Sequence, residues 1–525
     1  MSVIRVRQLK ILVDKKQIVL EKVAKKLHIT QDDIISYQLE KKSIDARNKN
    51  SIYYVYDLLV EVNDEGKIPN YVFGKDVFRA VPEKYVFPNT KLAKDKKIVI
   101  VGSGPSGMFC AYLLAEAGYK VLVVEQGQKM EERINSVEKF FETNELNVLS
   151  NVQFGEGGAG TFSDGKLNTL VKDKFHRGKK VFEIFVKNGA PEEIMYEQKP
   201  HIGTDIMRKV IINMREEMKK MGVNFTYNTK MTDINIENNK IVGIVVNDEE
   251  IIPCDILVLA IGHSARDTFE MLYEKNISMK SKNFAIGVRV EHPQEMINQS
   301  QYGKYAKLLP PASYKLTYNS SSNRAVYSFC MCPGGFVVNA SSEEGRIVVN
   351  GMSNYDRGEA NANSAIVVSV SKEDFGEGVL AGMQFQRQLE EKAFKLGNGL
   401  VPTQLYKDFV ANKVSISYGS FAKVGMGKSN FSNLRELFPE SINEALMEAI
   451  PYFDTKIKGF ARGDTIMSGV ESRTSSPVMI LRNELGEANV EGLYPCGEGC
   501  GYAGGITTSA MDGVKIAELI AQKEI

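Results

Sequence analysis

The first part of the chain alternates between strand-like and helix-like patterns of apolar residues. Val3 to Val13 alternates apolar and polar positions, which predicts a strand. Val19 to Leu27 has helical spacing, and the polar residues of Thr30 to Asp33 are typical of the start of a second helix. Ile52 to Val62 is rich in β-branched and aromatic residues and predicts a buried strand. Together these elements predict a small α+β unit over residues 1–93.

A lysine-rich segment, Lys91 to Lys97, ends this unit, and the pattern then changes. From Ile98 the chain has an apolar strand, a glycine turn, a helix and a second strand that ends at Val124. The next elements are a helix, a strand, a hairpin and an apolar strand, expected over 206–218, 223–227, 231–252 and 256–261. Strands that alternate with helices in this way indicate a parallel sheet.

The region from 286 to 455 differs because its pattern predicts many short strands and contains no glycine fingerprint. The final segment, 490–525, returns to a glycine-rich turn that opens a helix over Thr507 to Ala521. We therefore predict an α/β fold, with a discontinuous Rossmann-like domain, an inserted β-rich α+β domain and the small N-terminal α+β domain. The expected domain segments are 1–93, 94–285, 286–455 and 456–525.

Length and composition narrow the class of protein. The 525 residues exceed what one hydrophobic core usually serves, and 66 basic against 65 acidic residues give a formal charge of +1. This near-zero net charge does not indicate nucleic acid or a membrane surface as a partner. Six cysteines are too few for a disulfide scaffold, and the first twenty residues lack the apolar core of a signal peptide. Ile98 to Val124 is interrupted by Gly, Pro, Glu and Lys, so we expect no membrane span and a cytoplasmic protein.

A local basic run, KKSIDARNKN at 41–50, leaves a second possibility open. It suggests either an RNA contact or a solvated turn before a strand, and the turn is the commoner case for a short charge run. The two helices expected before it would also match a helix-turn-helix, a reading that the near-zero net charge disfavours.

The clearest chemical signal is a dinucleotide fingerprint at 98–127, IVIVGSGPSGMFCAYLLAEAGYKVLVVEQG. Gly102, Gly104 and Gly107 form G-x-G-x-x-G between a strand and a helix, where they serve the tight turn, the approach of a pyrophosphate and helix packing. Glu125 ends the second strand, 23 residues after Gly102, at the place where a carboxylate meets ribose hydroxyls. An acid in this position disfavours the 2′-phosphate of NADP.

Two further glycine-rich stretches have the freedom to lie against a planar cofactor. FGEGGAGTFSDGKL at 154–167 lacks a preceding strand and a following apolar helix, so we expect a loop that donates amides to a cofactor. GLYPCGEGCGYAGGITTSAMDGVKIAELI at 492–520 leads from a short strand through glycines into a helix. The N-terminus of that helix would stabilise negative charge, such as that of a reduced flavin.

These stretches, together with LVLAIGHSARDT at 257–268, resemble FAD flavoproteins of the two-dinucleotide-binding superfamily. GGAGTFSDGKLNT, FCMCPGGFVVNA and GVESRTSSPV, at 157–169, 329–340 and 469–478, resemble more closely the bacterial family of FAD-dependent dehydrogenases or oxidoreductases. The resemblance covers essentially the whole chain. It implies FAD as cofactor, held by a flavin domain built from the fingerprint, a middle strand and the C-terminal helix, with a substrate-side domain inserted between them.

The resemblance also implies which residues contact FAD. The pyrophosphate, ribose and adenine would lie against Gly102, Ser103, Gly104, Ser106, Gly107, Glu125, Gln126 and Arg133. The isoalloxazine would lie near Gly158, Ser163, Lys166, Gly505 and Ile506, with Gly262 at the end of the middle strand. Many members of the superfamily carry Gly-Asp at the ribityl chain, whereas this chain has Gly497 and Glu498.

Candidates for the chemistry on the substrate side are Cys332, Arg473 and His263. Cys330 and Cys332 form a C-x-C pair that suggests a dithiol linked to a flavin, or else small buried thiols. With Cys496 and Cys500 they lack the spacing of a zinc or iron–sulfur site, so no metal is expected. Arg473 would bind a substrate carboxylate or form an ion pair with Glu471 or another acid. His263 would be an acid/base, a contact of the flavin or a structural residue.

The function expected from these signals is an FAD-dependent oxidoreductase that passes a hydride or electron pair between a small organic substrate and flavin N5. The alternatives are a redox sensor that binds FAD without turnover, and a flavoprotein whose N-terminal unit docks RNA. A second fingerprint for a nicotinamide is absent. The electrons would therefore come from the substrate, from a partner protein, or from NAD(P)H bound without a Rossmann fold. The oligomeric state is left open.

Overall fold

A five-stranded parallel sheet of order β24-β11-β5-β6-β7 lies at the centre of the fold. The computed structural model describes residues 2–15, 18–81, 83–169 and 171–524. The strands are β5 (Ile98–Val101), β6 (Val121–Val124), β7 (Asn224–Thr226), β11 (Ile256–Leu259) and β24 (Leu493–Pro495). Strands such as IVIV and ILVL are buried at every position, as the central strands of a parallel sheet with both faces covered should be. The mixed α/β class and the parallel sheet expected from the sequence are confirmed.

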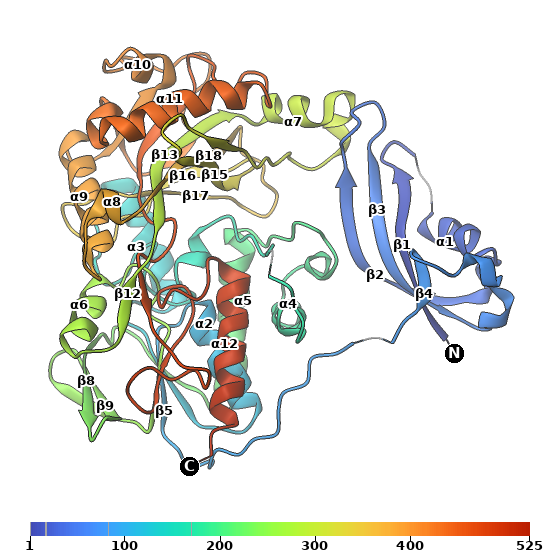
Figure 1. Ribbon diagram of the computed structural model, residues 1–525, viewed down its shortest axis with the longest axis horizontal. Coiled ribbons are helices and arrows are strands. Elements are labelled where there is room, and N and C mark those ends of the chain that lie inside the picture. The colour runs from blue at the N-terminus through green and yellow to red at the C-terminus, as the bar shows by residue number, and fades with distance from the viewer. Residues whose placement is uncertain (1, 16–17, 82, 170, 525) are drawn as a thin grey trace.

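Helices cover this sheet. Two of them, α2 and α12, pack directly against each other (Figure 1). A Cβ on Gly513 in α12 would lie 2.2 Å from the carbonyl oxygen of Ser106 in α2, so glycine is required for the two backbones to approach. This contact brings the C-terminal helix to the fingerprint, about 400 residues earlier in the chain. The helices of this region are α2 (Pro105–Glu116), α3 (Met130–Thr143), α4 (Arg177–Lys187), α5 (Thr204–Lys220), α6 (Arg266–Glu274) and α12 (Ile506–Ala521).

The order of the parallel strands creates a crevice at their carboxyl ends. From β5 the chain continues to β6 and β7 on one side, while β11 and β24 are added on the other side. The reversal lies between β5 and β11, and open α/β sheets bind ligands in the crevice outside such a switch point. The helices that follow β5, β11 and β24 in the chain, namely α2, α6 and α12, each begin near this edge.

A second, seven-stranded sheet has the order β14-β15-β18-β13-β22-β19-β21. It contains β13 (Phe284–Pro293), β14 (Thr317–Asn319), β15 (Ala325–Cys332), β18 (Asn361–Val370), β19 (Val401–Leu405), β21 (Ser429–Phe431) and β22 (Ile466–Glu471). Short strands such as β14, β19 and β21, of three to five residues, agree with the expectation for this region, whereas β13 and β18 are each ten residues long. Nearly all of their positions are buried, so they lack the alternation that reveals a strand in a sequence.

The helices of this second region are α7 (Gln294–Tyr302), α8 (Lys372–Phe375), α9 (Ala381–Leu396), α10 (Tyr406–Val410) and α11 (Glu440–Asp454). Because β22 pairs with β13 and β19, the seven-stranded sheet extends to Glu471, beyond the domain boundary expected at 455. The smaller sheets are β8–β10 (Met231–Glu237, Lys240–Val246, Glu250–Pro253), β12 with β23 (Met279–Ser281, Val478–Ile480), and β16, β17 and β20 (Phe336–Asn339, Val349–Met352, Gly425–Met426).

The N-terminal unit is a four-stranded sheet of order β2-β3-β1-β4 with one helix, α1 (Val19–Leu27). Its strands are β1 (Ser2–Leu12), β2 (Ile34–Asp45), β3 (Tyr53–Val62) and β4 (Val77–Arg79). The prediction that a second helix begins at Thr30 to Asp33 is wrong: Thr30 and Asp33 form a capping box around a single 3₁₀ turn, and β2 begins at the next residue. Because α1 is the single α-helix among the described residues of this unit, the helix-turn-helix interpretation is wrong as well.

The N-terminal sheet stands to one side of the molecule and is joined to β5 by a long extended segment (Figure 1). This segment runs along α12, where Tyr85 Oη donates a hydrogen bond to Glu518 and the amides of Lys91 and Leu92 donate to the carbonyl of Ala521. The sheet also contacts the rest of the chain through Lys42, whose Nζ lies 2.7 Å from Glu197 Oε1. The basic run at 41–50 is thus partly used in a contact within the chain.

None of the helices in the described part of the chain is long and apolar enough to cross a membrane.

Candidate functional site

A cavity of about 360 Å³ lies at the carboxyl ends of the parallel strands, and the second sheet forms its far wall. Its floor includes Val101, Val124 and Ala260, which lie at the ends of β5, β6 and β11. The far wall includes Phe329 of β15 and Glu471 of β22. The crevice at the switch point is therefore closed over by the inserted region, and one continuous cavity joins the dinucleotide fingerprint to the seven-stranded sheet.

Most of the residues expected to hold FAD, or to act beside it, line this cavity. They are Gly102, Gly104, Ser106, Glu125, Gln126, Gly158, Ser163, Lys166, Gly262, His263, Arg473, Glu498, Gly505 and Ile506. Five of the predicted site residues do not line the cavity: Ser103, Gly107, Arg133, Cys332 and Gly497. Several residues that were not predicted as site residues also line the cavity, among them Gln153, Asp164, Asn168, Thr229, Phe329, Asn350 and Thr474.

The fingerprint end of the cavity has a form that suits a pyrophosphate. Gly107 packs against the turn so closely that a Cβ would lie 1.9 Å from the carbonyl oxygen of Gly102. A Cβ on Gly104 would instead meet only Gly158 Cα, at 3.8 Å, so the backbone of Gly104 is open to the cavity. Pro105 begins α2 there, and Gly505 caps the N-terminus of α12 on the same cavity. Two helix N-termini present free amide donors and positive dipole ends to an anionic cofactor.

Glu125 fixes the loops around the fingerprint. One carboxylate oxygen accepts hydrogen bonds from the amide and hydroxyl of Ser103, at 3.0 and 2.7 Å. The other accepts from the amides of Gly127 and Gly155, at 2.9 and 3.0 Å. Glu125 thereby ties the turn after β5 to the glycine-rich loop 154–167 while one side of it faces the cavity. The contact of Glu125 with ribose remains a prediction.

Arg133 does not line the cavity, and its place differs from the expected adenine contact. Its side chain is completely buried and donates five hydrogen bonds to backbone carbonyls, at 2.7 to 3.2 Å. The acceptors are the carbonyls of Asn151, Val152, Gly155, Glu156 and Gly158. Arg133 therefore gives the loop its shape from behind, and the loop in turn forms the cavity wall.

Arg133→Lys should destabilise the protein by roughly 2–4 kcal/mol, because lysine cannot reach five carbonyls and leaves several of them buried without donors. The variant should also lower the affinity for FAD, since the loop 154–167 would lose its fixed shape. Urea unfolding of the FAD-free protein and titration with FAD measure the two effects separately. Wild-type stability in this variant would show that the five hydrogen bonds do not hold the loop.

The far wall carries a buried ion pair between Arg289 of β13 and Glu471 of β22. The guanidinium contacts both carboxylate oxygens, at 2.9 and 3.0 Å. Arg289 also donates to Asn363, Asn350 and the carbonyl of Cys330. Burial raises the pKa of Glu471, and the charge of Arg289 opposes that shift. The pair joins adjacent strands and places Glu471 and Asn350 on the cavity.

A second charged group lies where the glycine-rich loop meets the far wall. Lys166 lines the cavity, with its Nζ 3.8 Å from Asp164 Oδ2, and Arg357 contacts the same oxygen at 2.7 Å. Burial alone would raise the pKa of Asp164, but Lys166 and Arg357 hold it below the ordinary value. Lys199 is near both cations and burial lowers its pKa. Two cations on one carboxylate, with Lys199 near both of them, give this corner of the cavity a positive charge.

His263 lies in the loop after β11 and lines the cavity with Glu498. Its Nδ1 lies 3.2 Å from Glu498 Oε1. Its Nε2 is buried and has no hydrogen-bond partner within the described residues. The two residues come from the loops after β11 and β24, which are adjacent strands, so the sheet itself brings them together. Glu498, which stands where the resemblance would place an aspartate, thus lies against a histidine.

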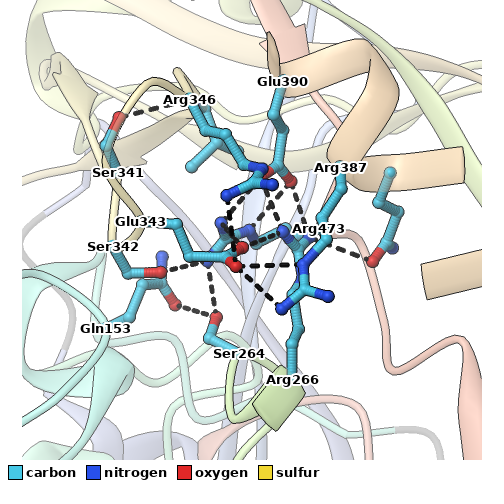
Figure 2. A network of polar contacts seen from close by, with 12 residues as sticks. Gln153, Ser264, Arg266, Ser341, Ser342, Glu343, Arg346, Arg387, Glu390 and Arg473 are labelled. Atoms are coloured by element: carbon cyan, nitrogen blue, oxygen red, sulfur yellow. Dashed lines mark hydrogen bonds and ion pairs between the residues drawn. The ribbon is translucent and has the colours of Figure 1, made fainter. Parts of the chain in front are cut away.

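Arg473 lies on the cavity, but its donors are used by protein groups (Figure 2). Nε and Nη2 contact the two oxygens of Glu390 at 3.0 and 2.7 Å. Nη1 donates to the hydroxyls of Ser264 and Ser342 at 2.9 and 2.6 Å. Of the two roles expected for Arg473, the ion pair is the one present, and its partner is Glu390 in place of Glu471.

The same network holds a second arginine on Glu390. Arg266 of α6 contacts both of its oxygens, at 2.8 and 2.7 Å, and also contacts Glu343 at 2.5 Å. Arg387 joins Glu343 to Glu270 at the edge of the network. Arg266 lies on α6, the helix after β11 of the parallel sheet, and Glu390 lies on α9 of the inserted region. The ion pairs between them therefore connect the two walls of the cavity (Figure 2).

The six cysteines are all free thiols. Cys332, the cysteine expected to be catalytic, is completely buried, and its neighbour Cys330 lines the cavity instead. Cys496 and Cys500 are buried below the C-terminal loop. No group of three or more histidine, cysteine, aspartate or glutamate residues that could hold a metal ion occurs among the residues that the structure describes.

Family models match three parts of the chain. Residues 283–474 match the C-terminal domain-like model of FAD-dependent proteins, and residues 100–138 match an NAD(P)-binding Rossmann-like domain. Residues 3–61 match a domain of unknown function. The first match covers the inserted region through β22, and the second covers the fingerprint with Glu125. Together with the open backbone at Gly104, the two helix N-termini and the unpartnered His263 Nε2 on the cavity, these matches fit FAD as the cofactor.

A protein of Clostridium beijerinckii, described as uncharacterized, is 48% identical over 530 residues, which covers 99% of each chain. Solved structures with a weak overall likeness include glycine oxidase from Bacillus cereus, at 13% identity and a TM-score of 0.36 over 82% of this chain and 98% of that one. L-proline dehydrogenase from P. horikoshii is 16% identical, with a TM-score of 0.34 over 82% and 94%. The relative that covers 99% of the chain and the two cofactor-related family models show that the chain belongs to a family of FAD-dependent proteins that includes the Clostridium protein.

Proposed function

We propose that this protein passes a hydride or electron pair between FAD and a small organic substrate bound against the wall formed by Asn350, Glu471 and Lys166. One observation carries the proposal: the cavity that begins at the dinucleotide fingerprint continues to this polar wall of the inserted region. FAD, when bound, supplies the two-electron chemistry at its N5 position. The protein supplies the position of the substrate and the charges around it.

In this proposal, separate parts of the cavity hold separate parts of FAD. The open backbone at Gly104 and the N-terminus of α2 would bind the pyrophosphate, and Glu125 with Gln126 would lie beside the adenosine. The ring system would lie at the other end, against the loop 158–166 and the start of α12. Support comes from the single cavity that all of these groups line, and from Lys166, whose charge acts on Cys330 of the far wall.

The charges at the ring end favour the reduced cofactor and an anionic substrate. The N-terminus of α12 offers a positive dipole end to negative charge that develops on a reduced flavin. Lys166 has only a loose ion pair with Asp164, at 3.8 Å, and therefore has donor capacity for a carboxylate or another anion. Arg473, whose donors already contact Glu390 and two serine hydroxyls, is proposed as a positioning residue rather than a substrate ligand.

His263 is proposed as the group that takes or returns the substrate proton. Its Nε2 is buried on the cavity without a protein partner, while Nδ1 faces Glu498. A carboxylate on one ring nitrogen fixes the tautomer and orientation of a histidine and leaves the other nitrogen for chemistry. Loss of such a base costs a reaction roughly 10²- to 10⁴-fold in rate.

His263→Gln should therefore lower the rate of flavin reduction by the organic substrate by about 10²-fold or more. The variant should still bind FAD, because glutamine fills a similar volume and leaves the fingerprint untouched. His176→Gln is the matched control, since His176 lies at the start of α4 and pairs with Glu83, away from the cavity lining. Stopped-flow absorbance under anaerobic conditions measures the rate. An unchanged rate in His263→Gln would remove the proposed proton role.

The test of the function itself is anaerobic reduction of the bound flavin by NADH, NADPH and a panel of small organic acids, amines and amino acids. We expect an organic compound to bleach the flavin absorption at a rate that saturates with its concentration. If dithionite reduces the flavin but nothing in a broad panel does so, the protein is a redox sensor without turnover. The RNA-docking alternative is not favoured, because Lys42 in the basic run is engaged with Glu197.

The proposal also includes an electron partner and a cellular location. NAD(P)H bound transiently, or a redox protein, would close the catalytic cycle. Six free cysteines and the small-molecule chemistry support a cytoplasmic location. The oligomeric state is open to measurement by light scattering.

A further inference from the structure

The C-x-C pair of β15 lies at an irregularity of the seven-stranded sheet. The pairing of β15 with β18 shifts register between Phe329 and Cys332. At this shift Cys330 has a φ of +43°, a backbone conformation that L-residues other than glycine seldom adopt. Bulges of this kind re-aim side chains and are frequent beside active sites. Here the bulge turns Phe329 and Cys330 onto the cavity, while Cys332 is buried.

The bulge also folds the two cysteines back onto each other. The thiol of Cys332 donates a hydrogen bond to the carbonyl oxygen of Cys330 at 3.4 Å, and Arg289 Nη1 donates to the same oxygen at 3.1 Å. Cys332 fits there because residue 351 is glycine: in any other residue at this position, the Cβ would lie 2.7 Å from the sulfur. The pair is thus held by strands β13, β17 and β18, with one thiol toward the cavity and the other behind it.

The surroundings favour a thiolate at Cys330. The neighbouring thiol of Cys332 lowers the pKa of Cys330, and the charges of Lys166 and Arg289 lower it further, against burial and Asp164. The neighbouring Cys330 and burial raise the pKa of Cys332. The other cysteines differ: Cys110, Cys254 and Cys500 are buried, and burial raises the pKa of each. A thiolate next to a second thiol is the arrangement in which thiol–disulfide chemistry is fast.

We propose that Cys330 and Cys332 form a redox-active dithiol that exchanges an electron pair with FAD in this cavity. Oxidation of the pair forms a Cys330–Cys332 bond and releases two electrons and two protons, including the proton that leaves Cys330 when it ionises. Two-electron reduction of FAD to its fully reduced form takes up the same two electrons and two protons. The inference rests on FAD occupying the cavity, and it adds to the proposed function a second two-electron centre on the substrate side.

An anaerobic titration of the FAD-loaded, oxidised protein with dithionite tests this directly. Wild type should take up two electron pairs per chain, one for FAD and one for the disulfide, whereas Cys330→Ser and Cys332→Ser should each take up one pair. Cys254→Ala, a buried cysteine outside the cavity lining, is the matched control and should keep both pairs. FAD content of each variant shows that the fold is retained.

A thiol count gives a second measurement that does not depend on turnover or on FAD. Diamide-treated protein, denatured and alkylated, should have lost two of its six reactive thiols, and peptide mapping should place the loss at residues 330 and 332. Uptake of one electron pair by wild type, with all six thiols alkylated after diamide, would overturn the dithiol. If flavin binds and an organic substrate reduces it in that case, the proposed function stands without the dithiol. If no flavin binds but two thiols are lost, the cofactor assignment fails instead.

Discussion

Gly104→Ala should weaken FAD binding by at least about 100-fold, a loss of about 2.7 kcal/mol, while the FAD-free protein keeps its stability. The backbone at Gly104 has a φ of −72°, which alanine adopts without strain, and the nearest atom to a new Cβ would be Gly158 Cα at 3.8 Å. The methyl group would thus fit the protein but occupy the side on which a pyrophosphate must approach. Flavin fluorescence gives the affinity, and thermal unfolding without FAD gives the stability.

Gly102→Ala provides the contrast for this experiment. Gly102 has a φ of +99°, and a Cβ there would lie 2.3 Å from the carbonyl oxygen of Ala260. This variant should lose both FAD binding and stability, because it breaks the turn between β5 and α2. Binding by Gly104→Ala within about threefold of wild type would mean that the cofactor does not approach the fingerprint as proposed.

Glu390→Gln should lower the free energy of unfolding by roughly 3–5 kcal/mol, because it removes the buried carboxylate that two buried guanidinium groups share and leaves them only Glu343 as counter-charge. Glu390 is 0% exposed and contacts both Arg266 and Arg473 through paired hydrogen bonds. Burial alone would raise the pKa of Glu390, but the two arginines hold it well below its ordinary value. The network joins α6 to α9, so its loss should also loosen the wall of the cavity. Urea unfolding monitored by circular dichroism measures the change.

Glu270→Gln is the control at the edge of the same network. Its carboxylate contacts Arg387 at 2.6 Å, but the side chain is 37% exposed, so the pair is largely solvated. Removing it should cost less than about 1 kcal/mol. Equal losses in Glu390→Gln and Glu270→Gln would show that burial of the two arginines on Glu390 does not dominate the stability of this region.

The parallel sheet and the cofactor end of the site were predictable because their signals are local. Buried strands of four apolar residues, the three glycines and the acid at Glu125 all lie within about thirty consecutive residues, and their roles follow from backbone geometry. The single turn at Thr30 shows the limit of such signals. Polar residues of this kind begin both helices and capped turns. The residues that follow form the strand β2 because they pair with β3.

The rest of the site depends on contacts that no local pattern contains. Arg473 meets Glu390, 83 residues away in the sequence, through ion pairs within a packed interface. Cys330, rather than Cys332, lines the cavity because the bulge in β15 depends on its register against β18. Arg133 follows the fingerprint closely enough to suggest a cofactor contact, yet its donors turn toward five carbonyls of the loop behind it.

The central claim is that FAD lies along this cavity, with its ring system at the wall that carries Lys166, Glu471 and Cys330. Electron density from crystals of the FAD-loaded protein tests it most directly. We expect the pyrophosphate at Gly104 and the start of α2, and the ring between the loop 158–166, the start of α12 and that wall. FAD bound elsewhere, or bound with its ring directed away from the seven-stranded sheet, would contradict the account.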